Sequence, residues 1–289
     1  MEETKNLNIN WYPGHMSKAI RLMKEDIKLI DVIIELVDAR IPYSSKNPEI
    51  DNLAGNKKRI LLFNKSDMAD TERTKLWREY YEAKGFAVAE INSKGGFGIR
   101  QVNDLILKVC AEKLAKDKAK GILNRPVRAM VVGIPNVGKS TFINSFAGKS
   151  VAKTGNKPGV TTGKQWIRLN KNVELLDTPG VLWPKFEDDE IGKRIAWIGS
   201  INENILNTYE LTLILCDYLV KQYPGAIASK YGIEECDDSG ELILRIAAKR
   251  NCMLKGNVPD VERVVTFVAD DFKNARIGRF TLEIPSDRM

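Results

Sequence analysis

Histidine and cysteine are scarce in this sequence. Among 289 residues there are one histidine and four cysteines, and no two cysteines form a C-x-x-C pair. Zinc sites and disulfide frameworks need such residues at defined spacings, so the pattern favours reduced thiols over either. The residues concerned are His15, Cys110, Cys216, Cys236 and Cys252.

Long hydrophobic runs are also missing. Apolar runs such as residues 32–34, and the apolar part of 128–132, are far shorter than the roughly 20 residues that cross a bilayer. The first thirty residues carry five Lys or Arg and no apolar stretch, so no secretory signal is expected. We therefore expect a cytoplasmic protein without a membrane partner. A hydrophobic content of 43% is ample for a packed core.

The net charge of +7 is unevenly distributed. Residues 1–186 contain 32 Lys and Arg against 20 Asp and Glu, whereas residues 187–289 contain 13 against 18. An excess of positive charge on the first part suggests a polyanionic partner, most plausibly RNA. Solubility alone explains the excess equally well, so charge does not decide between them.

The first two thirds of the chain alternate strand-like and helix-like segments. This alternation predicts an α/β fold, with a doubly wound, mostly parallel sheet covered on both faces. Residues 165–169 and 172–176 read as a hairpin. The expected strands are 32–37, 59–63, 86–91 and 128–132, and the expected helices are 16–29, 71–84, 99–118 and 138–146.

The pattern changes after about Trp183. Amphipathic helices are expected at 187–200, 209–222, 240–254 and 259–274, and a strand at 280–284. We therefore predict two domains, an α/β domain over 1–185 and a small helical domain over 186–289.

Residues Gly133–Ser140 read G-x-x-x-x-G-K-[ST], the phosphate loop. The segment follows an apolar strand and opens a helix, as this motif requires. Backbone N–H groups would approach the phosphates, the Lys139 ammonium would meet the outer phosphates, and the Ser140 hydroxyl would bind Mg²⁺. The nucleotide-contacting residues expected here are Asn136, Val137, Gly138, Lys139, Ser140 and Thr141.

Residues Asn64-Lys65-Ser66-Asp67 read N-K-x-D, the guanine-reading motif. The Asp67 carboxylate can accept hydrogen bonds from guanine N1–H and the exocyclic amine, a pair of donors that adenine lacks. The segment Asn92-Ser93-Lys94 follows the next expected strand, where a backbone support for the guanine carbonyl belongs.

Residues Asp177-Thr178-Pro179-Gly180 read D-x-x-G, the segment that senses the γ-phosphate. Asp177 would hold Mg²⁺ through a water, and the Gly180 N–H would meet the γ-phosphate. A threonine of the upstream segment 158–163 should give Mg²⁺ a hydroxyl; we prefer Thr161, with Thr162 as the alternative.

The order of these motifs is rotated. In ordinary small GTPases the phosphate loop comes first and the guanine motif last, whereas here the guanine motif precedes the phosphate loop by about seventy residues. All the parts are present, so the order indicates a circularly permuted GTPase domain.

The chemistry expected of this site is GTP hydrolysis, with Lys139 and Gly180 among the catalytic groups. Many GTPases orient the attacking water with a glutamine directly after D-x-x-G, but this chain has Val181 and Leu182. His15 is one candidate for that role, although a lone histidine is more often structural. A second candidate is a potassium ion held by Asn136, which would supply positive charge beside the phosphates.

In combination, three segments resemble the ribosome biogenesis GTPase A family of circularly permuted bacterial GTPases: Trp11-Tyr12-Pro13-Gly14-His15-Met16, Val37-Asp38-Ala39-Arg40-Ile41-Pro42 and the run from Asp177 to Pro184. The resemblance covers nearly the whole chain. It implies a GTPase that binds the immature large (50S) ribosomal subunit and promotes a late assembly step. It also implies a role for His15 in hydrolysis, potassium-stimulated activity through Asn136, and a C-terminal domain that contacts RNA.

Two readings of the activity remain. In the first, GTP hydrolysis is a timer that releases the protein from the pre-ribosome; in the second, nucleotide only orders an RNA-binding surface and hydrolysis is incidental. The expected partners in both are the large-subunit precursor, its rRNA and ribosomal proteins, and neither DNA nor a membrane. A kinase would need an acceptor-binding region that the sequence does not show.

Overall fold

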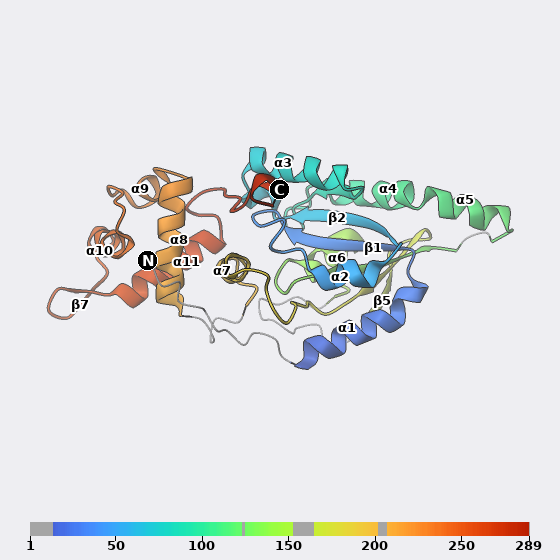
Figure 1. The fold of residues 1–289 in the computed structure, drawn as a ribbon, viewed down its shortest axis with the longest axis horizontal. Coiled ribbons are helices and arrows are strands. Elements are labelled where there is room, and N and C mark those ends of the chain that lie inside the picture. The colour runs from blue at the N-terminus through green and yellow to red at the C-terminus, as the bar shows by residue number, and fades with distance from the viewer. Residues whose placement is uncertain (1–13, 123–124, 153–164, 202–206, 289) are drawn as a thin grey trace. The chain divides into compact units, whose positions relative to one another are not determined.

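The computed structural model describes residues 14–122, 125–152, 165–201 and 207–288. These residues form two compact units (Figure 1). The sheet unit comprises the described residues of Trp11–Glu187 and Thr281–Met289, and the helical unit comprises those of Asp188–Phe280. The last residues of the chain therefore belong with the sheet, which differs from the single boundary at 185/186 that we expected.

A six-stranded sheet organises the sheet unit. Its strand order is β3-β2-β1-β4-β6-β5, and every neighbouring pair is parallel except β5 and β6. All seven residues of the central strand β1 are buried, as expected for a parallel strand covered on both faces. The predicted α/β fold and the hairpin are thus confirmed. The strands are β1 Val32–Asp38, β2 Lys58–Asn64, β3 Ala87–Glu90, β4 Val127–Gly133, β5 Gln165–Arg168 and β6 Val173–Asp177.

The helices of the sheet unit agree with the sequence pattern except at two places. The helix expected over 99–118 is divided at Cys110, where one helix ends and the next begins. The short helix over 48–54 was not expected; it starts because the Asn47 side chain accepts from the Glu49 N–H and Pro48 takes the first position. The helices are α1 Gly14–Asp26, α2 Pro48–Ala54, α3 Thr71–Ala83, α4 Ile99–Val109, α5 Ala111–Ala119 and α6 Lys139–Ala147.

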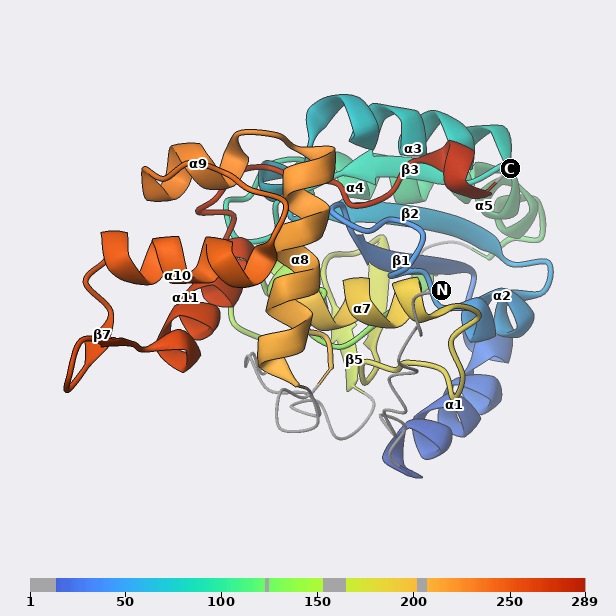
Figure 2. The ribbon, with the colours of Figure 1, turned by 60° about the vertical axis from the view of Figure 1, so that its left-hand side comes forward.

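Helix α3 is held to the sheet by aromatic side chains. Trp77 and Tyr81 are buried against Val37, Leu61 and Phe63 of β1 and β2. The Trp77 and Tyr81 rings are stacked with centroids 5.7 Å apart. Figure 2 shows α3 and α4 beside β2 and β3. This packing fixes the ends of β1 and β2, which carry part of the site described below.

The helical unit contains five helices among its described residues, most of them capped by an acidic or amide side chain. The caps are Asp188, Asn207, Asp238 and Asp260. The helix expected over 240–254 ends at Lys249; its last residues form a small antiparallel hairpin instead. The elements are α7 Asp189–Trp197, α8 Thr208–Gln222, α9 Ala226–Tyr231, α10 Ser239–Lys249, β7 Met253–Leu254, β8 Val258–Pro259 and α11 Val261–Lys273.

Residues 281–288 form a strap that returns to the sheet unit and packs against α3 (Figure 2). The strand expected over 280–284 was wrong, because these residues belong to no strand; the Leu282 N–H donates to the Arg40 carbonyl (2.7 Å). Side chains hold it: Glu283 accepts from Ser44 N–H (3.0 Å) and Ser44 Oγ (2.6 Å), and the Trp77 indole donates to the Glu283 carbonyl (2.9 Å). A short 3-10 helix, Pro285–Arg288, follows.

Within the described ranges, no helix has both the length and the apolar character that a membrane span requires.

Candidate nucleotide site

The phosphate loop connects β4 to α6. Gly133 adopts φ +150°, and a Cβ there would lie 2.6 Å from the Leu36 carbonyl oxygen. Gly138 adopts φ +102°, and its Cβ would lie 2.4 Å from Asn64 Nδ2. Both positions require glycine for conformational and steric reasons. The loop therefore wraps closely against β1 and the guanine motif, and its backbone N–H groups are left at the start of α6, where the helix dipole favours an anion.

Lys139 is buried inside this loop. Its Nζ donates to the carbonyl oxygens of Gly133 (3.0 Å) and Ile134 (2.8 Å). Burial lowers the pKa of Lys139 to about 8, although the nearby Asp177 carboxylate opposes the shift. A buried ammonium whose partners are neutral carbonyls is suited to receive phosphate oxygens, which would restore the charged form.

Asp177 ends β6 and faces Lys139. Burial raises the pKa of Asp177 to about 6, while the Lys139 charge and the Thr178 N–H lower it. Its Oδ1 is buried and has no hydrogen-bond partner in the described structure. A buried carboxylate oxygen left in this state fits a hydrated Mg²⁺ ion, because a metal-bound water would donate to it. Ser140, half-buried at the start of α6, is placed to supply the hydroxyl ligand.

Gly180 packs directly on the phosphate loop. A Cβ at this position would lie 2.8 Å from Lys139 Nζ and 2.8 Å from Pro135 Cα. The Val181 N–H donates to the Gly133 carbonyl (3.3 Å), and the Thr178 Oγ1 donates to the Val131 carbonyl (2.7 Å). The D-x-x-G segment and the phosphate loop are therefore in contact.

Asn64 joins the guanine motif to the phosphate loop across 73 residues of sequence. Its Nδ2 donates to the Val137 carbonyl (2.7 Å). Its Oδ1 accepts from the Ser93 N–H (3.0 Å) and Oγ (2.8 Å). One buried amide thus connects all three segments that the sequence assigned to guanine and phosphate recognition.

Lys65 adopts a left-handed conformation, φ 59°, and its Nζ donates to the Asn136 carbonyl (3.0 Å). The same Nζ forms an ion pair with Asp38 Oδ2 (2.9 Å). Arg40 holds the other side of that carboxylate through Nε to Oδ1 (2.9 Å) and a terminal nitrogen to Oδ2 (2.9 Å). These two cations keep the pKa of Asp38 below its usual range despite full burial.

The sequence analysis gave Asp38 and Arg40 no role. A signal was available in the sequence. Asp38 ends the fully buried strand β1 at the same edge of the sheet as Asn64, and polar side chains at such strand ends gather around ligands.

The remaining residues predicted to recognise guanine lie at the same edge of the sheet. The Asp67 side chain is exposed and follows Lys65 in a short 3-10 helix. The Asn92 Oδ1 accepts from the N–H groups of Lys94 (3.0 Å) and Gly95 (2.7 Å), which fixes the turn after β3. The Ser66 N–H donates to the Ile91 carbonyl (3.2 Å), which joins the two loops.

Several predicted residues are not placed. Thr161 and Thr162 lie outside the described residues, as does the side chain of His15, whose backbone belongs to α1. Val181 and Leu182 are buried, so the structure puts two apolar side chains where many GTPases have glutamine. In the parts of the chain that are described, no group of three or more His, Cys, Asp or Glu could hold a metal.

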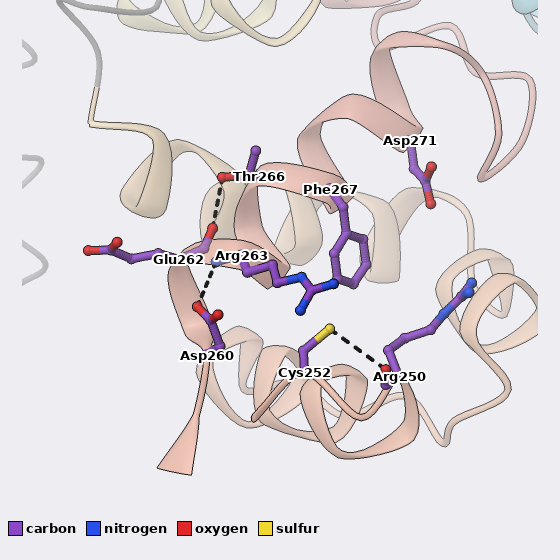
Figure 3. Close-up of a pocket in the computed structure, with 8 residues that line it drawn as sticks. All are labelled: Arg250, Cys252, Asp260, Glu262, Arg263, Thr266, Phe267 and Asp271. Carbon is purple, nitrogen blue, oxygen red and sulfur yellow. Dashed lines mark hydrogen bonds between the residues drawn. The ribbon is translucent and has the colours of Figure 1, made fainter. Parts of the chain in front are cut away.

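A separate hollow of about 740 Å³ lies in the helical unit (Figure 3). Its walls mix two arginines with three acidic residues, and several are already engaged: the Asp260 carboxylate caps α11, and Asp271 accepts from the Tyr231 hydroxyl (3.1 Å). None of the nucleotide motifs contributes to it. It is therefore not part of the nucleotide site.

Comparisons with known proteins identify the family of this chain. The family model described as "50S ribosome-binding GTPase" matches residues 128–249. The Ribosome biogenesis GTPase A of Bacillus cereus is 44% identical over 280 residues, 96% of this chain and 95% of that protein. The protein of the same name from Thermotoga maritima is 32% identical over 96% of this chain and 95% of its own length.

Two solved structures show the same fold. The GDP-bound structure of YlqF has a TM-score of 0.66 and 27% identity, covering 92% of this chain and all of the other. GNP-bound YlqF from T. maritima has a TM-score of 0.62 and 27% identity, over 93% and 98% of the two chains. With 44% identity along almost its entire length, this chain belongs to the ribosome biogenesis GTPase A family and is a GTPase of ribosome biogenesis.

Proposed function

We propose that the protein binds the immature large (50S) ribosomal subunit in its GTP-bound state, promotes a late assembly step, and leaves after hydrolysis to GDP. One observation carries the proposal. The D-x-x-G segment contacts the phosphate loop, and the chain passes from it into the helical unit within eight residues of Gly180, at Asp188. Loss of the γ-phosphate therefore acts on the segment that leads to a second unit.

Charge and family support the ribosomal partner. The excess of positive charge before residue 187 suits rRNA, and the matched family model is named for binding to the 50S subunit. Ribosomal proteins beside that rRNA are the further expected contacts, with DNA and membranes excluded from the proposal. The helical unit, over residues 188–280, is proposed as an RNA-contacting module, and the cytoplasm as the place of action.

The nucleotide would be held by the groups already described. Asp67 would accept from the guanine edge, Asn64 and Lys65 would fix the loop around it, and the turn at Asn92–Lys94 would support the ring. Lys139 would pair with the outer phosphates. Hydroxyls of Ser140 and Thr161 would bind Mg²⁺, with Asp177 acting through water, and the ion would supply positive charge to the phosphates. The N–H groups of Asn136, Val137, Gly138, Thr141 and Gly180 complete the proposed phosphate contacts.

Hydrolysis requires a positioned water. Since Val181 and Leu182 cannot hydrogen-bond to it through their side chains, we assign the positioning to His15. A water held near the γ-phosphate by an imidazole would attack in line, and Lys139 would stabilise the charge that develops on the phosphate oxygens.

A potassium ion coordinated by Asn136 is proposed as the second source of positive charge. The proposal is supported by the position of Asn136 in the phosphate loop, with φ 57°. Hydrolysis measured in potassium and in sodium at equal ionic strength tests it. We expect faster hydrolysis in potassium, and equal rates would remove the ion from the mechanism.

The His15→Ala variant separates the timer from the simple binding factor. We expect it to bind GTP and immature large subunits normally but to remain bound, as measured by sedimentation of subunits with GTP and with GDP. Normal release with slow hydrolysis would instead favour the binding factor. Depletion of the protein in cells should lead to incomplete large subunits in a sucrose gradient; normal subunits would contradict the proposed pathway.

A further inference from the structure

A hollow rich in positive charge lies at the sheet edge opposite the nucleotide site. Its volume is about 340 Å³, and it is formed by the start of β2, the turn between α3 and β3, and the end of α4. Of its eight described lining residues four are cationic and none is acidic: Lys57, Lys58, Arg59, Lys84, Gly85, Phe86, Ala87 and Val109. Because β2 and β3 are parallel, their opposite ends carry the guanine motif, so the two sites lie at opposite edges of one sheet.

The hollow continues toward α5. A second depression of about 240 Å³ shares Lys58 and Val109 with the first and adds Lys113 and Lys116. Its two acidic residues, Asp31 and Glu112, are paired with these lysines, Asp31 with Lys113 at 3.5 Å and Glu112 with Lys116. The two depressions share Lys58 and Val109, and we call them together the basic groove, along the amino ends of the strands.

One cation of the groove has a structural partner. The Arg59 guanidinium pairs with the carboxylates of Glu35 and Asp51, and Glu35 is fully buried. A buried carboxylate needs such a partner, so Arg59 is explained by the fold.

None of the other three cations forms an ion pair with a described carboxylate, although the Lys58 charge helps to lower the pKa of Glu112 after the larger effect of Lys116. Lys57 Nζ donates to the Ile30 carbonyl (2.7 Å), and the exposed Lys58 side chain makes no hydrogen bond to a described residue. Lys84 Nζ donates to the Tyr80 hydroxyl (2.5 Å) and lies 4.2 Å from the centre of its ring. Neighbouring ammonium groups repel one another, and their contacts with neutral groups do not offset this repulsion as a carboxylate would. An anionic partner explains why they gather.

We propose that the basic groove binds the phosphodiester backbone of RNA, through Lys57, Lys58 and Lys84. This inference rests on the proposed function, which makes rRNA the partner. An elongated groove of separate lysines suits successive phosphates along a strand better than one isolated phosphate. Its apolar lining residues are half-buried, which does not suit insertion into a lipid surface. Contacts of this kind are independent of base sequence.

The experiment compares the wild-type protein with the triple variant Lys57→Gln, Lys58→Gln, Lys84→Gln. Binding to a short single-stranded RNA of mixed sequence is measured between about 50 and 200 mM salt. Each phosphate contact to a single strand contributes about −0.7 to the slope of log K against log salt, so loss of three contacts should reduce the slope by about 2. GDP affinity should not change, because the nucleotide site lies at the other edge; this also shows that the variant is folded.

The matched control is Lys75→Gln, Lys149→Gln, Lys171→Gln. These lysines are exposed residues of the same unit, outside both depressions, and the variant has the same net charge as the test variant. We expect it to keep the wild-type slope. Equal loss in both variants would show general charge attraction and overturn the inference, while the rRNA partner would stand.

Three further outcomes would each overturn the inference. Wild-type protein that binds no RNA would overturn the inference and the rRNA partner together. Inorganic phosphate is also added to the wild-type protein at constant ionic strength. If phosphate displaces the RNA and reduces the salt dependence of RNA binding to that of the triple variant, the groove is a single-phosphate site and the RNA proposal is wrong. If the triple variant loses binding to phosphatidylserine vesicles but not to RNA, the partner is a lipid surface and the proposal is again wrong.

Discussion

The Asp38→Asn substitution tests how the guanine motif is held. The Asp38 carboxylate is fully buried and satisfied by Arg40 on one side and Lys65 on the other, with all three nitrogen to oxygen distances at 2.9 Å. An asparagine keeps the shape but removes the charge, so two cations would face a neutral amide. Breaking a buried ion pair by neutralising one partner costs about 3–5 kcal/mol. We expect the free energy of unfolding to fall by that amount.

The pH dependence of the unfolding free energy gives a second test of the Asp38 pair. Because the folded-state pKa of Asp38 lies below the unfolded value of about 3.9, its stabilisation is fully present above that pH and is lost as pH falls through the folded value. The difference in unfolding free energy between wild type and variant should therefore be constant from neutral pH down to about pH 5 and narrow below pH 4. Urea unfolding followed by tryptophan fluorescence measures it.

Nucleotide binding should weaken in parallel. Burial lowers the pKa of Lys65, and Asp38 is the largest of the charges that raise it. Without the carboxylate the Lys65 ammonium loses its anchor and its pKa falls further, so affinity for GDP and GTP should drop about tenfold or more, which is about 1.4 kcal/mol. The loss should be smaller at lower pH, where Lys65 is protonated again. Hydrolysis by the saturated protein should change little.

The control is Asp104→Asn, which neutralises an exposed carboxylate on α4. It should leave both stability and nucleotide affinity within experimental error. If Asp38→Asn matches this control in unfolding and in GDP binding, then the Asp38 pair neither stabilises the fold nor positions Lys65, and the reasoning fails.

Three other perturbations follow from the geometry. Gly180→Ala places a Cβ 2.8 Å from both Lys139 Nζ and Pro135 Cα, so single-turnover GTP hydrolysis should slow at least about tenfold with GDP affinity nearly kept; normal hydrolysis would contradict close packing on the phosphate loop. Glu283→Ala removes the acceptor of two Ser44 hydrogen bonds and should lower the unfolding free energy by about 2–4 kcal/mol in urea, whereas an unchanged midpoint would show that the strap is not held there. GDP affinity should fall as pH rises through about 8, since the Lys139 ammonium must be charged to meet phosphate; a flat profile from pH 7 to 9.5 by calorimetry would refute that assignment.

Much of the sheet unit was predictable because its signals are local. A buried parallel strand reads as a short apolar run, and each ligand loop begins where such a run ends. The strands that precede the phosphate loop and the guanine motif were both expected within a residue or two of their observed ends, at Gly133 and Asn64. The strand wrongly predicted over 280–284 depends on contacts far along the sequence. Residues 280–284 read as a strand by composition, yet this segment is held by the Arg40 carbonyl, by the Ser44 N–H and hydroxyl, and by the Trp77 indole.

The motifs could be assigned to one edge of the sheet from sequence despite their rotated order, whereas the Asp38 pair could not be predicted. In the sheet, Asp38 lies beside Asn64 in register, and Leu36 lies beside Gly133, so the ends of β1, β2 and β4 meet at one edge whatever order the chain follows. Motifs with known chemistry can therefore be assigned to that edge from sequence. Asp38 has no such motif of its own, and its significance comes from the neighbour across the ladder. Knowledge of which strands are adjacent, rather than of which residues are polar, was the missing information, and it identifies an acidic residue at a strand end as the anchor of Lys65 in the N-K-x-D segment.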